Sequence, residues 1–182
     1  MKKILIIVGS LRKNSFNHQL AMCAKGILEK HAEVDFLSFS DLPFMNQDIE
    51  FPTPESVARV RQAVQDADGI WMFSPEYNYQ IPGVLKNLLD WLSRPLIPGD
   101  PQRNSAVKGK PVTISSVAGR SAGAGVRKNL SALLEIMSMR VIGGMGTGVS
   151  LEAESFQTGE LILSEKHVEE LHAQAEAFLN AL

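Results

Sequence analysis

The sequence contains a single cysteine, Cys23, and no excess of charge of either sign. One thiol cannot form an intrachain disulfide, but a chain of 182 residues needs none. A domain of that size buries about 70% of the surface that its unfolded chain exposes, so its core forms without disulfides or a structural metal. Its 18 Lys and Arg residues nearly balance its 20 Asp and Glu residues. This balance argues against a nucleic acid or an anionic membrane as partner.

Long apolar runs are also missing. The longest, residues 4–8, is far shorter than the roughly 20 residues of a membrane span, and the chain opens without the pattern of a secretory signal. Internal repeats, low-complexity tracts and long linkers are absent. We therefore expect a cytoplasmic protein that has no membrane span and forms a single domain over residues 1–182.

Short apolar runs alternate with segments of helical period. Residues 4–8, 69–73 and 111–114 are rich in β-branched or aromatic side chains and lack polar alternation, which is typical of parallel strands covered on both faces. Residues 34–37 and 140–142 complete five predicted strands. The predicted helices cover residues 16–30, 55–67, 82–92, 126–139 and about 164–181. This order predicts a three-layer, doubly wound α/β sandwich.

Two helices carry further information. The last one has an apolar stripe, which we expect to face the core. On its opposite side it carries Glu169, Glu170 and Gln174, and we expect these three side chains to face solvent. The helix over residues 82–92 has more apolar side chains than one face can hold, so we expect a second subunit to cover it. The alternative is complete burial within one chain.

Ligands of open parallel sheets bind beyond the carboxyl ends of the strands. Three segments follow such ends here, residues 9–17, 74–82 and 115–125. The first reads GSLRKNSFN and runs into a helix, whose N-terminus attracts anions. Its side chains can hold a phosphate monoester, or Ser15 or Asn14 can simply cap the helix. The segment matches neither the dinucleotide-binding nor the P-loop glycine pattern.

The other two segments suit a flat ligand. Residues 74–82 hold two tyrosines and two amides between prolines that stiffen the backbone. Residues 115–125 are small throughout, so their backbone can approach a ring closely. The alternatives are a rigid turn whose tyrosines pack on a helix, and ordinary turn glycines.

The sequence offers no metal site and no catalytic nucleophile. The four histidines lack ligand spacing with one another or with carboxylates. Cys23 lies inside the first predicted helix, beside Met22 and Ala24. This position favours a buried, unreactive thiol.

Residues 74–95 read SPEYNYQIPGVLKNLLDWLSRP, and residues 9–17 show a Gly-Ser-x-Arg-x-x-Ser spacing. With these motifs, nearly the whole chain resembles the NAD(P)H-dependent FMN reductases of the flavodoxin-like superfamily, a group that includes quinone, chromate and azo-dye reductases. The resemblance implies a flavodoxin-like three-layer α/β/α sandwich with a five-stranded parallel sheet in the order 2-1-3-4-5. It also implies a homodimer or homotetramer, in agreement with the apolar helix over residues 82–92.

The resemblance assigns the site residues to three groups. The phosphate of FMN is bound by Ser10, Arg12, Ser15 and Asn17. The isoalloxazine ring is lined by Pro75, Glu76, Tyr77 and Asn78, largely through backbone groups. Its other side is closed by Ser116 and Gly119. Candidates for the extra phosphate of NADPH are Arg12, Arg120 and Arg127.

The implied activity is hydride transfer from NADPH or NADH through bound FMN to a small acceptor, by a ping-pong mechanism. The acceptor is a quinone, free flavin, azo compound or metal oxyanion, and no catalytic side chain or metal is required. One alternative is a non-enzymatic flavodoxin-type FMN carrier that docks to protein partners, although a net charge of -2 provides little steering. Another is a flavin-free descendant, which the presence of Arg12 and both serines disfavours.

Overall fold

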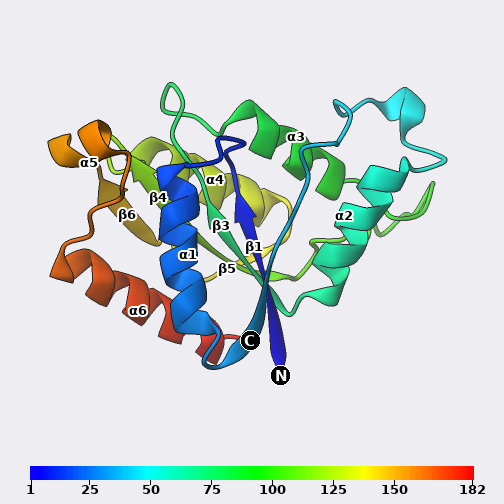
Figure 1. The fold of residues 1–182 in the computed structure, drawn as a ribbon. Helices are drawn as coiled ribbons and strands as arrows, with labels where there is room; N and C mark the ends of the chain where they lie inside the picture. The colour runs from blue at the N-terminus through cyan, green and yellow to red at the C-terminus, as the bar shows by residue number, and fades with distance from the viewer.

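The computed structural model describes residues 1–182 as one parallel sheet between two layers of helices (Figure 1). Four strand–helix pairs come first: β1 (Lys2–Val8) and α1 (Phe16–Leu28), β2 (Ala32–Phe36) and α2 (Glu55–Asp66), β3 (Gly69–Phe73) and α3 (Gly83–Leu92), β4 (Pro111–Ala118) and α4 (Ala124–Ile136). A short 3-10 turn, η1 (Gln47–Ile49), lies between β2 and α2. The chain ends with β5 (Arg140–Val141), β6 (Thr147–Ser150), α5 (Ala153–Thr158) and α6 (Glu165–Asn180). None of the helices combines the length and the apolar character that crossing a membrane requires.

The strands pair in the order β2-β1-β3-β4-β5, and every pairing is parallel. The predicted fold class and strand order are therefore confirmed. Side chains of β1 alternate between two apolar cores. Ile4 and Ile6 face α1 and α6, which lie side by side in Figure 1, whereas Leu5 and Ile7 face α2, α3 and α4.

The last predicted strand, over residues 140–142, is confirmed as β5, and the chain adds a further strand, β6, after it. β5 pairs with the start of β4, and β6 pairs with its end, from Ser115 to Ala118. Between them Gly143, Gly144 and Gly146 have φ of 76°, 60° and 58°, a left-handed conformation that breaks a strand. The sheet therefore has six strands, and β6 and α5 were not predicted.

A buried glutamine of α6 attaches this helix to β4 and β6 at this edge of the sheet. The Gln174 side-chain nitrogen donates to Thr113 Oγ1 and to the Ile114 carbonyl, at 2.7 Å each. Its oxygen accepts from Ser115 Oγ at 3.0 Å and from the Thr147 N–H at 2.9 Å. The expectation that Gln174 faces solvent is therefore wrong, because its four hydrogen bonds offset the cost of burying the amide.

The apolar surplus of α3 is covered by the chain itself. Leu85, Leu88 and Leu92 are fully buried in the single chain, and so is Trp91. The connection between β2 and α2 crosses the outer side of α3, where the Pro43 carbonyl accepts from Trp91 Nε1 at 2.8 Å and from Asn87 Nδ2 at 2.9 Å. The alternative of burial within one chain is therefore what the structure shows, and the apolar side chains of residues 82–92 no longer require a second subunit to cover them. The homo-oligomer implied by the resemblance stays a prediction without an assigned face.

Candidate functional site

Three loops meet where β1, β3 and β4 end, at the upper side of Figure 1. The Gly9 N–H donates to the Phe73 carbonyl at 2.7 Å, and the Ser74 N–H donates to the Ser115 carbonyl at 3.0 Å. These bonds continue the sheet for one residue beyond β1 and β3, so the loops start from fixed positions. We call the space between them the crevice, and number its loops in chain order.

The first loop ends at an uncapped helix. Ser15 is the N-cap residue of α1, and its hydroxyl makes no capping hydrogen bond. Asn14 is used elsewhere, since its Nδ2 donates to the Gly159 carbonyl at 3.3 Å and its Oδ1 accepts from Gln19 Nε2 at 3.2 Å. The capping alternative is therefore not what the structure shows. The first-turn N–H groups of α1 keep their affinity for an anion.

Arg12 supplies the positive charge of this loop. Its guanidinium lies over the Phe16 ring, 5.1 Å from the ring centroid, and the side chain is exposed. It takes part in none of the ion pairs of the structure. The Ser10 hydroxyl accepts from the Arg12 N–H at 3.3 Å, which turns the loop toward α1. A phosphate here meets a cation with no competing carboxylate.

Asn17 plays a different part from the one expected. Its side chain is buried, with Nδ2 donating to the Val117 carbonyl and Oδ1 accepting from the Val117 N–H, at 2.9 Å each. Both ends of the amide are thus used to attach α1 to β4. Only the backbone N–H of Asn17, in the first turn of α1, is directed as an anion site requires.

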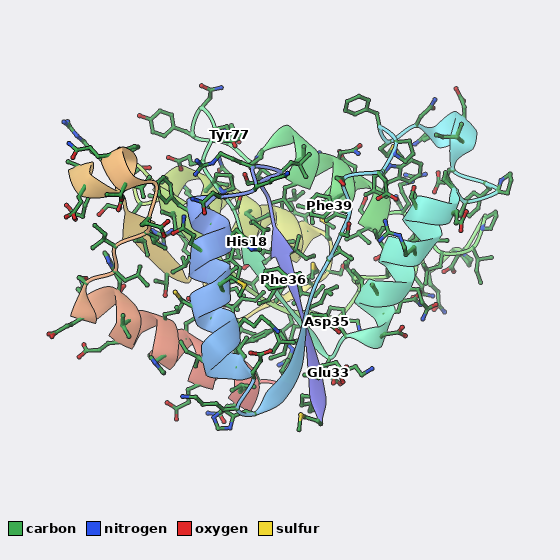
Figure 2. The ribbon with its side chains drawn as sticks, in the orientation of Figure 1. His18, Glu33, Asp35, Phe36, Phe39 and Tyr77 are labelled. Carbon is green, nitrogen blue, oxygen red and sulfur yellow. The ribbon has the colours of Figure 1, made fainter.

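The second loop is a tight turn. Tyr77 and Gln80 exchange backbone hydrogen bonds of 3.2 and 2.9 Å across Asn78 and Tyr79. These two residues have φ of 53° and 63°, as in a two-residue hairpin turn. The side chains of Tyr77 and Tyr79 are 53% and 71% exposed, and Figure 2 shows Tyr77 on this loop at the upper side of the molecule. The alternative in which both tyrosines pack on a helix is therefore wrong.

Glu76 fastens the second loop to α4. Its Oε1 accepts from Ser121 Oγ at 2.6 Å, and its Oε2 accepts from the Val126 N–H at 2.7 Å, so the carboxylate caps the first turn of α4. A Cβ on Gly125 would lie 2.8 Å from Glu76 Oε2 and 2.9 Å from the Tyr79 carbonyl oxygen. Only glycine fits there, which holds the second and third loops in close contact.

The third loop begins later than predicted, because β4 continues to Ala118. Ser116 is consequently a buried strand residue, and its hydroxyl donates to the Ser74 carbonyl at 2.6 Å. Gly123, with φ of 69°, lies directly over it, since a Cβ there would come within 1.9 Å of Ser116 Oγ. Gly119 faces open space. Ser116 therefore supports the loop from below, and Gly119 is the exposed member of the pair.

Arg127 is used inside the protein. Its Nε donates to the Ala122 carbonyl at 3.2 Å and its Nη1 to the Gly146 carbonyl at 2.8 Å. Burial lowers the pKa of the guanidinium from its ordinary value. Arg12 and Arg120 are exposed. The set of arginines available for a second phosphate is therefore reduced to these two.

The family model described as NADPH-dependent FMN reductase matches residues 2–152. The chain belongs to this family. A quinone reductase from Escherichia coli (strain K12) is 36% identical over 167 residues, which cover 88% of this chain and 85% of the relative. A 2-hydroxy-1,4-benzoquinone reductase from Burkholderia sp is 45% identical over 93 residues, and this match spans about half of each chain, 51%.

Solved structures agree with the family assignment. A flavoenzyme NAD(P)H:(acceptor) oxidoreductase from Paracoccus denitrificans superimposes with a TM-score of 0.85 at 29% identity, covering 99% of this chain and 96% of the other. The structural likeness extends over almost the full length of the chain, beyond the residues 2–152 that the family model matches.

The crevice fits the FMN from which the family takes its name. The uncapped N-terminus of α1 and the unpaired Arg12 suit the dianionic phosphate monoester. Gly119 and the fastened turn at Asn78 leave backbone groups, rather than bulky side chains, beside a flat ring.

Proposed function

We propose that this FMN reductase family member is an NAD(P)H-dependent oxidoreductase that holds FMN in the crevice and reduces small quinones. The observation that carries the proposal is the N-terminus of α1, where the cap hydroxyl of Ser15 is unused and Arg12 has no acidic partner. Both relatives described above are named for quinone reduction, which makes quinones the first class of acceptor to test. Free flavins, azo compounds and metal oxyanions are further acceptors.

The phosphate group is held by side chains and backbone of the first loop. Arg12 supplies two parallel N–H donors, and the hydroxyls of Ser10 and Ser15 complete the cradle. Asn17 contributes its backbone N–H, since its amide is committed to Val117. The positive end of the α1 dipole adds a further attraction for the phosphate.

The ring is positioned by backbone groups of the other two loops. Pro75, Glu76, Tyr77 and Asn78 flank one side, and Gly119 flanks the other above Ser116. When bound, FMN accepts a hydride from NADPH or NADH and passes the electrons to the acceptor. The N–H groups at Asn78 are fixed by the turn, so they stabilise negative charge on the ring without rearranging. Donor and acceptor use the same open face in turn, which gives ping-pong kinetics.

The carrier alternative has less support. A net charge of -2 provides a weak field for steering protein partners. The exposed tyrosine turn leaves the crevice open to small molecules.

The direct test is the visible spectrum of the purified protein with NADPH in the absence of oxygen. We expect a flavin spectrum that bleaches, followed by rapid reoxidation on adding a small quinone. Flavin that stays oxidised would identify a carrier, and a protein that takes up no FMN would refute the proposal.

Arg12→Ala tests the site itself. The loss of a charged hydrogen bond, about 1.5–3 kcal/mol, raises the Kd for FMN about 10- to 100-fold. Lys13→Ala, an exposed cation of the same loop, is the matched control and leaves the Kd within about twofold. Equal effects of both variants would show that general charge, rather than Arg12, holds the phosphate.

A further inference from the structure

A hollow of about 190 Å³ lies beside the first loop, at the carboxyl end of β2. Ser10 and His18 line it on the side of α1, and Phe36, Ser38, Phe39 and Ser40 line it on the side of β2. Figure 2 shows His18 on α1 beside Phe36 at the end of β2, with Phe39 farther along the connection that follows. None of the functions assigned above uses this hollow.

The lining of the hollow selects a neutral, flat group. It contains no Asp, Glu, Lys or Arg side chain. The rings of His18 and Phe36 lie with centroids 5.2 Å apart, and three serine hydroxyls offer donors and acceptors around them. Stacking on aromatic faces with hydrogen bonds at the edge is how proteins bind a nucleobase. The volume is below the 300–1,000 Å³ or so of pockets for drug-sized ligands, so the hollow accepts one ring system and not a whole nucleotide.

The wall on the side of β2 is held in place by hydrogen bonds. The Leu37 N–H donates to the Ile6 carbonyl at 2.9 Å, and the Leu42 N–H donates to the Phe39 carbonyl at 3.3 Å. Arg59 donates to the Ser38 carbonyl and to Asp41, at 2.7 Å each. The hollow is therefore preformed, and a ring entering it pays little ordering entropy.

The order of the strands fixes what such a ring is attached to. Because β1 lies between β2 and β3, the hollow, the phosphate cradle and the two ring-binding loops follow one another across the sheet. If the flavin phosphate lies at α1 and its ring lies between the loops after β3 and β4, the side of the phosphate away from the ring is the side nearest β2. Ser10 belongs both to the cradle and to the hollow, so the two spaces are continuous.

We propose that the hollow binds the adenine of FAD, so that the protein accepts FAD as well as FMN. This inference rests on the proposed function, because it takes the flavin phosphate to lie at the N-terminus of α1. The adenine lies against the exposed side of the Phe36–His18 pair, and Ser38 and Ser40 hydrogen-bond to its edge. Recognition of the base then adds to the recognition of the flavin that the crevice provides.

The test compares FMN and FAD binding to the flavin-stripped full-length protein by titration calorimetry. We expect FAD to bind at least as tightly as FMN. Phe36→Ala removes one stacking face and lowers the FAD affinity about tenfold. Ser40→Trp, at an exposed position, fills the hollow and has a similar effect without risk to the core. Both variants keep the FMN affinity within about twofold, which also shows that they are folded.

Three outcomes would overturn the inference. FAD binding that is more than about tenfold weaker than FMN binding would show that the adenylate has no site. Equal losses for FMN and FAD in Phe36→Ala and Ser40→Trp, or no loss for either, would show that the adenine lies elsewhere. In these cases FMN binding by the parent protein remains, so the proposed function stands. If the parent protein binds neither flavin, the proposed function fails and the inference fails with it.

Discussion

Glu76 connects the second loop of the crevice to α4, and replacing it measures how much that connection contributes. Its two oxygens accept from Ser121 Oγ at 2.6 Å and from the Val126 N–H at 2.7 Å. A hydrogen bond to a charged group contributes about 1.5–3 kcal/mol, and a carboxylate at a helix N-terminus about 0.3–1 kcal/mol. Since Glu76 is half-buried, water replaces part of this interaction in the variant. We therefore expect Glu76→Ala to destabilise the protein by about 2–3 kcal/mol.

The destabilisation of Glu76→Ala can be measured by thermal unfolding and by flavin binding. In a chain of this length, 1 kcal/mol corresponds to about 2–4 °C, so the Tm of Glu76→Ala falls by about 4–12 °C. Glu76→Gln keeps an oxygen for the Val126 N–H but loses the charge, and we expect a smaller loss of about 1 kcal/mol. FMN affinity falls in the same order, because the second and third loops separate when the cap is lost.

Glu160→Ala is the matched control, since it removes the same charge at an exposed position outside the crevice. Its effect on stability stays within about 0.5 kcal/mol. A Glu76→Ala protein with the Tm of the parent would refute the capping role. A Glu76→Gln protein as unstable as Glu76→Ala would show that the charge, rather than the hydrogen bonds, matters.

Two further substitutions test the fold that supports the crevice. Gln174→Leu leaves the Thr147 N–H and the Ile114 carbonyl unpaired, at a cost of about 1–3 kcal/mol each. Urea unfolding should therefore show a free energy of unfolding lower by about 2–6 kcal/mol. Stability equal to that of the parent would show that β6 is held without this amide. Leu88→Asp places an unpaired carboxylate in the core and unfolds the chain, with a loss above about 4 kcal/mol by circular dichroism. A folded Leu88→Asp protein with half the native mass in size-exclusion chromatography would restore α3 as a subunit interface.

The central strands were predictable because their residue types alone indicate that they are buried. Residues 4–8 and 69–73 are apolar at every position, which is typical of a strand covered on both faces. β6 has no such signal, since its four residues, Thr147–Ser150, include a glycine and two hydroxyl side chains. Its pairing depends on β4 and on Gln174, contacts between residues far apart in the sequence. A local pattern does not contain that information.

The residue types of the site were also predictable, but the use of their side chains was not. Asn17 and Ser116 are polar residues beside the loops of the crevice. The Asn17 side chain is paired with the backbone of Val117, and the Ser116 hydroxyl is paired with the carbonyl of Ser74. The sequence shows that a side chain can donate or accept a hydrogen bond, but it does not show which group is its partner.

Cys23 is a case in which the signal was present and misread. It is exposed rather than buried, although partial desolvation raises the pKa of its thiol. The buried positions of α1 include Leu20, Ala21, Ala24 and Leu28, and their spacing places Cys23 on the other face.

The walls of the crevice are held together by polar contacts between elements that are far apart in the sequence. Asn17 attaches α1 to β4, Ser116 attaches β4 to the end of β3, and Glu76 attaches the loop after β3 to α4. The proposed phosphate cradle and the proposed ring-binding loops are therefore connected to one another through hydrogen bonds. A flavin that binds to loops already fixed in this way does not pay the entropy of ordering them, so it binds more tightly than it would to mobile loops. For the same reason, a substitution at Asn17 weakens ring binding as well as phosphate binding, even though its side chain touches neither.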